Sequence, residues 1–73
     1  MKKEERVFTE REIEVLELLA QGWNNGAMAE KLFISYSAVR SRLKDLYAKF
    51  DLEEPSKYDR RLKLALIGKE MFG

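Results

Sequence analysis

The feature that most constrains this fold is a join of only three residues between two helical patterns. Residues 25–32 and residues 36–50 each carry apolar side chains at helical spacing, and Phe33, Ile34 and Ser35 alone separate them. Such a short turn forces a sharp angle between a short helix and a longer one. The sequence therefore predicts a helix-turn-helix, with the longer helix held away from the body of the protein.

The remaining patterns predict two further helices and no strand. Thr9 and Glu12 fit a capping box at the start of a helix that Gly22 ends. A fourth helix follows an acidic segment that contains Pro55. We therefore expect an all-α fold in which one domain covers residues 1–73, with helices over about 10–21, 25–32, 36–50 and 57–71.

Charge is segregated along the chain, although the net charge is only +1. Residues 35–50 hold four cations against one acid. At about 100° per residue, the apolar stripe of the third helix leaves small hydroxyls and cations on its outward face, where an arginine can bond guanine in the major groove. A solvated helix face is the alternative, which the tight turn disfavours. The candidate DNA-binding residues are Asn25, Ser35, Tyr36, Ser37, Arg40, Ser41, Arg42 and Lys44.

The fourth helix carries two apolar stripes, whereas the core of a small domain needs only one. One stripe contains Tyr58, Leu62, Ala65 and Leu66. We expect the second stripe to form a dimer interface, and the alternative is that it wraps further over the first helix. The candidate interface residues are Leu64, Ile67 and Met71.

Composition excludes several classes of function. The chain has no cysteine and no histidine, so disulfides, thiolate zinc sites, cysteine nucleophiles and histidine bases are absent. No apolar run approaches the roughly 20 residues of a membrane span, and no signal peptide is evident. We expect a cytoplasmic protein that uses no metal, cofactor or membrane. We expect no enzyme, because the glutamates of the first helix fit a solvated face: Glu10, Glu12, Glu14 and Glu17.

Residues 9–22 closely resemble the opening of the LuxR-type helix-turn-helix domain, also called the GerE or FixJ type, which reads roughly T-x-R-E-x-E-V-L-x-L-L-A-x-G. The resemblance continues through residues 28–35, Val39-Arg40 and Lys49-Phe50, and covers about residues 8–52 without gaps. It implies a bacterial four-helix DNA-binding domain whose third helix reads the major groove and whose fourth commonly makes a dimer contact. Without an N-terminal sensor or receiver domain, the chain resembles the small free-standing members.

The chain departs from the family pattern in four places, one of which is a segment over residues 53–62 that is longer than usual and matches no family pattern. Gly26-Ala27 replaces the usual Lys-Glu, and Asp51 stands where a glycine usually ends the third helix. Residues 38–42 replace Thr-Val-Lys-x-His, although Arg40 keeps the cationic position. Residues 35–43 also resemble, more distantly, region four of bacterial sigma factors, but there is no room for the other regions that a sigma factor needs.

These observations predict a sequence-specific, double-stranded DNA-binding transcription regulator that acts as a homodimer, with RNA polymerase as a further candidate partner. The alternative is a protein-interaction module with the same fold, such as a polymerase-binding adaptor or an antagonist of a regulator. A large apolar patch left exposed on a monomer favours the module, whereas a homodimer that buries this patch favours the regulator.

Overall fold

The computed structural model describes residues 7–52 and 56–73. These residues form four α-helices and no strand, which confirms the all-α expectation. The observed helix bounds differ from the expected ones by at most one residue, and Pro55 lies outside the described residues. The helices are α1 (Glu10–Ala20), α2 (Asn25–Leu32), α3 (Tyr36–Lys49) and α4 (Lys57–Phe72).

Each helix begins at a side-chain cap. The first backbone N–H groups of a helix have no partner within it, so a side-chain oxygen just before the helix stabilises its start. Thr9 and Glu12 form the expected capping box at α1, with both hydrogen bonds present. The capping side chains of the four helices are, in order, Thr9, Asn24, Ser35 and Ser56.

Three helices end in the same backbone motif, in which one residue adopts a left-handed conformation. This residue is Gly22 after α1 (φ 94°), Phe33 after α2 (φ 58°) and Asp51 after α3 (φ 55°). A Schellman hydrogen bond accompanies each of them. The expected end of α1 at Gly22 is thus observed, and the other two helices end in the same way without a glycine. The three bonds run from Trp23 N to Leu18 O (3.1 Å), Ile34 N to Ala29 O (3.1 Å) and Leu52 N to Tyr47 O (2.9 Å).

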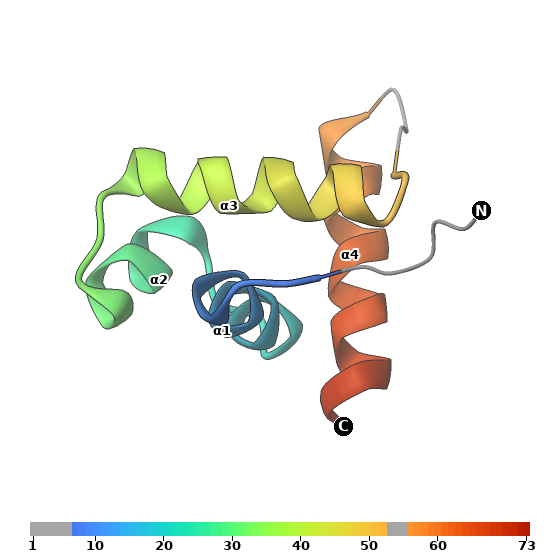
Figure 1. Cartoon of the computed structure of the whole chain (residues 1–73), viewed down its shortest axis with the longest axis horizontal. Helices are drawn as coiled ribbons and strands as arrows, with labels where there is room; N and C mark the ends of the chain where they lie inside the picture. The colour runs from blue at the N-terminus through green and yellow to red at the C-terminus, as the bar shows by residue number, and fades with distance from the viewer. Residues whose placement is uncertain (1–6, 53–55) are drawn as a thin grey trace.

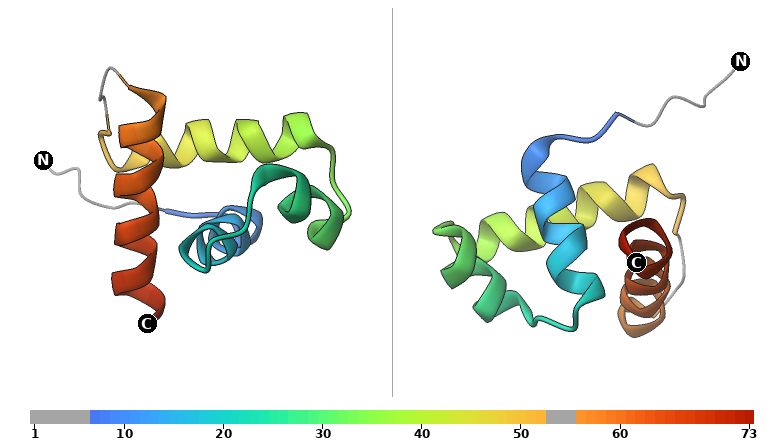
Figure 2. Two further views of the ribbon diagram at one scale, coloured as in Figure 1. Left: turned by 180° about the vertical axis from the view of Figure 1, so that it is seen from behind. Right: turned by 90° about the horizontal axis from the view of Figure 1, so that it is seen from below.

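α1 is the central element of the fold. It crosses α3 on one side and α4 on another, while α2 lies beside the first half of α3 (Figures 1 and 2). α4 stands across the far half of α3 at a steep angle (Figure 1). All four helices contribute to one apolar core, so the orientation of α3 is set by packing from several elements. The buried apolar side chains are Val15, Leu16, Leu19, Met28, Val39, Leu43, Leu46 and Leu64.

α4 approaches α1 closely because Gly68 lies at the contact. A Cβ atom at this position would lie 3.1 Å from both the carbonyl oxygen of Leu16 and the Cβ of Ala20. The missing side chain lets the two backbones come together, and Leu64, one turn earlier, is inserted into the core with 0% of its surface exposed.

This packing corrects the expected dimer interface. Leu64 lies inside the core and cannot meet a second subunit, while Ile67 is half-buried and Met71 is exposed at the end of α4. The alternative, that this stripe wraps over the first helix, therefore holds for Leu64. The stripe that stays exposed is the other one: Tyr58 (74%), Leu62 (49%) and Leu66 (55%).

Candidate nucleic-acid interface

The outward face of α3 carries the candidate residues in the expected arrangement. Val39, Leu43 and Leu46 fix the helix on the core, and Ser37, Arg40, Ser41 and Lys44 are then all exposed, as is Tyr36 at the start of the helix. Arg42 lies apart from this group. It is half-buried on the flank that faces α1, where its charge acts on the carboxyl group of Glu12.

Two candidate residues also make hydrogen bonds within the protein, Ser35 at the start of α3 and Asn25 at the start of α2. Ser35 Oγ accepts a hydrogen bond from Ala38 N (3.0 Å), which leaves the hydroxyl hydrogen available as a donor. Asn25 Oδ1 accepts from Arg61 Nη1 (2.8 Å). Because an arginine can only donate, this bond fixes the amide so that its NH₂ group is turned away from Arg61 and can donate elsewhere.

A shallow groove of about 770 Å³ runs along one flank of α3, between this helix, the start of α2 and the first half of α4. Of the described residues that line it, four are cations, namely Arg40 and Lys44 of α3 and Arg60 and Arg61 of α4, and none is an acid. This described lining is therefore positively charged, in a chain whose net charge is only +1. We call these four residues and the space between them the cationic groove.

Arg60 and Arg61 were not among the residues predicted from the sequence to form the site. Both lie one turn before Leu64, so on a helical wheel they flank the side of α4 that turns toward the protein. The guanidinium of Arg60 lies over the ring of Tyr47, 5.0 Å from its centre, and Arg61 also donates to Trp23 O (3.3 Å). No signal in the sequence could have placed them there, because helical periodicity does not show which apolar stripe of α4 turns inward.

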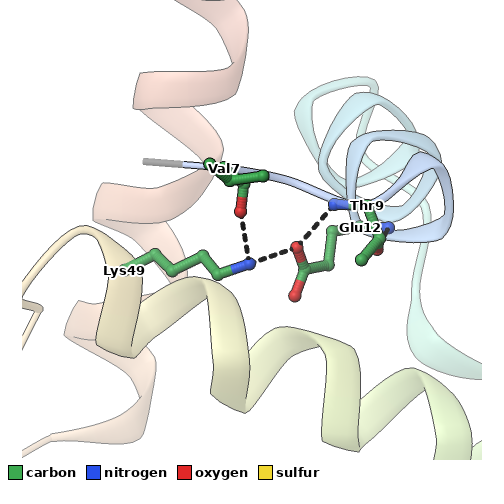
Figure 3. A network of polar contacts seen from close by, with 4 residues as sticks. All are labelled: Val7, Thr9, Glu12 and Lys49. Carbon is green, nitrogen blue, oxygen red and sulfur yellow. Dashed lines mark hydrogen bonds and ion pairs between the residues drawn. The ribbon is translucent and has the colours of Figure 1, made fainter. Parts of the chain in front are cut away.

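On the opposite flank, Lys49 joins the end of α3 to the start of α1 (Figure 3). Its Nζ donates to Glu12 Oε1 (2.6 Å) and to Val7 O (2.8 Å), while Thr9 N donates to the same Glu12 oxygen (3.0 Å). Glu12 is only 3% exposed, so the expectation that it belongs to a solvated face is wrong. The capping box draws its carboxylate back over the helix end, where α3 covers it.

The charge state of Glu12 follows from these contacts. Burial raises the pKa of its carboxyl group, but the hydrogen bonds from Lys49 and from the Thr9 backbone, with the charges of Lys49 and Arg42, outweigh this and hold the pKa below its ordinary value. The ionised pair therefore ties α3 to α1 at neutral pH.

The comparisons with known proteins agree with this geometry. The family model of bacterial regulatory proteins of the luxR family matches residues 6–57. The chain belongs to the LuxR family. Its helix-turn-helix of α2 and α3 is therefore the DNA-binding element of a family of transcription regulators.

Curated relatives support the same assignment. The chain is 35% identical over 63 residues to the oxygen regulatory proteins NreC of Staphylococcus haemolyticus and Staphylococcus carnosus, and 33% identical to that of Staphylococcus epidermidis. In each case the match covers 85% of this chain and 29% of the relative, so the chain spans less than a third of the length of these proteins. No solved structure matches the chain significantly.

Residues 7–52 and 56–73 contain neither a cluster of metal ligands nor a membrane-spanning helix. This part of the chain has no group of three or more acidic side chains that could hold a metal ion. Its helices are also too short or too polar to cross a membrane. The exposed face of α3 and the cationic groove are thus the features from which a function can be argued.

Proposed function

We propose that this protein is a sequence-specific, double-stranded DNA-binding transcription regulator that inserts α3 into the major groove. The observation that carries the proposal is the exposed outward face of α3, where Arg40 and Lys44 alternate with the small side chains of Ser37 and Ser41. Small side chains allow the helix to lie deep in the groove, and the guanidinium of Arg40 matches the O6 and N7 acceptors of guanine. Lys44 reaches a base edge or a phosphate.

Selection of bound duplexes from a random pool, followed by fluorescence anisotropy on the selected site, tests this proposal. We expect Arg40→Ala to weaken the selected site by about 1–3 kcal/mol and to relax specificity at one base pair. Affinity should also fall steeply as salt increases. If the protein binds no duplex at low salt, or binds every duplex equally, the proposal is wrong. Lys69→Ala, which removes a cation from the last turn of α4, serves as the control.

We further propose that the protein acts as a homodimer through α4. Tyr58, Leu62 and Leu66 recur every four residues and lie on one side of the helix, so two copies can bury this stripe against each other by helix packing. A dimer also doubles the contact with DNA, and its site should contain two half-sites about 10 bp apart or a multiple of that spacing.

The oligomeric state tests this second step. Sedimentation equilibrium of the wild type should give a dimer, and Leu66→Glu should give a folded monomer with unchanged helix content. A wild-type monomer at high micromolar concentration would refute the homodimer. In that case the same exposed stripe favours the alternative function, a protein-interaction module whose partner is RNA polymerase or another regulator.

A further inference from the structure

We propose that Arg60 and Arg61 of α4 bind the phosphate backbone of the DNA strand that borders the major groove occupied by α3. This inference rests on the function proposed above and extends it to a helix that would otherwise only support the core and pair with a second copy. The ligand chemistry is that of consecutive phosphodiester groups in a duplex.

The relative sizes of a helix and the major groove place phosphates beside α3. An α-helix with its side chains is about 10–12 Å across, and the major groove of B-DNA is about 12 Å wide. An inserted helix therefore has a phosphate strand along each flank. One flank of α3 is the cationic groove, whose far wall is formed by Arg60 and Arg61, so a strand along this flank meets α4 as well as α3.

The chemistry of this wall suits phosphate oxygens. Arginine forms paired, charge-assisted hydrogen bonds with phosphate, and the recorded hydrogen-bond partners of Arg61, Asn25 Oδ1 and Trp23 O, are both neutral. Its positive charge is thus not cancelled by these bonds. They also hold its guanidinium in place, so that less side-chain entropy is lost on binding. The Tyr47 ring positions Arg60 in the same way.

Asn25 extends the same surface to the start of α2. Its oxygen is taken by Arg61 Nη1 at 2.8 Å, so its NH₂ group is the part left to donate to a phosphate oxygen. Arg61 therefore contributes twice, through its own charge and by orienting a neighbouring donor. Half or more of the hydrogen bonds in protein–DNA complexes go to the backbone, and they set the register of the recognition helix without reading sequence.

The test compares Arg60→Gln and Arg61→Gln with Lys69→Gln, which removes the same charge from the same helix but at its other end. For each variant, Kd is measured on the selected duplex and on an unrelated duplex over a range of salt concentrations, and thermal melting confirms the fold. We expect each of the two arginine variants to bind both duplexes more weakly and to lower the salt slope by about 0.9. Between about 50 and 200 mM salt, each variant should then lose roughly 3.5-fold less affinity than the wild type does.

Single methylphosphonate substitutions in the selected duplex locate the contact. Each substitution neutralises one phosphate, and the phosphate that Arg60 binds should matter to the wild type and to Lys69→Gln but not to Arg60→Gln. Arg61→Gln also loses the hydrogen bond to α2. If its Tm is lower than that of the wild type, the result for Arg60→Gln alone tests the inference. Unchanged slopes in folded arginine variants, or an equal loss in Lys69→Gln, overturn the inference while DNA binding by the wild type still stands. A wild type that binds no DNA refutes the proposed function itself.

Discussion

The buried pair of Lys49 and Glu12 should contribute far more to stability than a surface pair does. The ammonium group of Lys49 lies 5.4 Å from the centre of the Phe8 ring. Replacing Lys49 with Met keeps an aliphatic side chain near this ring but removes the donor to Glu12 and to Val7 O. The carboxylate is then left nearly covered, with one backbone N–H as its recorded partner. Burying a carboxylate that has lost its cationic partner costs several kcal/mol of folding free energy in a fully buried site.

The expected cost of Lys49→Met is about 2 kcal/mol, which is less than for a fully buried pair, because 31% of the lysine side chain is exposed and water can replace part of its effect. For a domain of this size, that cost lowers Tm by roughly 8–16 °C. Glu12→Gln keeps the shape and the hydrogen bonds but loses the charge, and should cost about 1 kcal/mol. Because the two substitutions remove the same interaction, the double variant should lose less stability than the sum of the losses in the two single variants.

Urea denaturation of the four proteins in this cycle measures the coupling between Lys49 and Glu12. A matched control exists in α1, where Arg11 and Glu14 form an ion pair at 2.8 Å with side chains 39% and 46% exposed. Its coupling should stay below about 0.5 kcal/mol. A coupling for Lys49 and Glu12 no larger than that of the control pair would refute the argument that burial makes this contact important.

The pH dependence of the cycle gives a second measurement. The folded pKa of Glu12 is lowered, so the unfolded chain takes up a proton first as the pH falls below about 4.3. The stabilisation is therefore complete above that pH and is lost as the pH falls through the lower, folded pKa. The difference in stability between the wild type and Glu12→Gln should be constant from pH 6 to 8 and shrink in acid. A difference that does not change in acid would contradict this assignment.

Two further outcomes follow from the packing of α4 and the end of α3. Leu64→Ala should destabilise the protein by about 2–5 kcal/mol, because it opens a cavity in the core, whereas Leu66→Ala should change the stability of the monomer by less than about 0.5 kcal/mol. Urea denaturation at protein concentrations below the dimer dissociation constant compares the two variants. Equal losses of stability would contradict the orientation of α4. Asp51→Gly should raise stability by about 1 kcal/mol, because glycine adopts the left-handed conformation without a steric cost and removes an acid from the negative end of the α3 dipole. Asp51→Asn isolates the charge effect in the same denaturation assay, and an Asp51→Gly protein no more stable than the wild type would argue against strain at this position.

The sequence was sufficient for the helices because their signals are local. Side-chain caps such as Thr9 and Ser35 and the apolar spacing within each helix lie within a few residues of one another. The outward face of α3 followed from the same periodicity. The left-handed end at Phe33 was not predictable, since phenylalanine does not favour that conformation and the surrounding hydrogen bonds impose it. Asp51 gave a weak signal, because aspartate adopts this conformation more often than most residues and stands where the family usually has a glycine.

The contacts that depend on how the helices are placed relative to one another could not be predicted from the sequence. Periodicity showed that α4 has two apolar stripes, but not which stripe turns inward, and the close contact at Gly68 decides this. The arginines of α4 reach the flank of α3 only because α4 is rotated in this way. The contact of Lys49 with Glu12 joins residues 37 positions apart, and nothing in the local sequence at either end requires the other.

The bond from Lys49 to Val7 O also fixes the position of the first described residue. It holds Val7 on the flank of α3 that faces away from the cationic groove, and Gly73 ends α4 at the end remote from α3 (Figure 1). Attachments at either of these points therefore leave the groove unobstructed. A fluorophore, an affinity tag or another folded unit attached at these points leaves both the cationic groove and the exposed side chain of Arg40 uncovered.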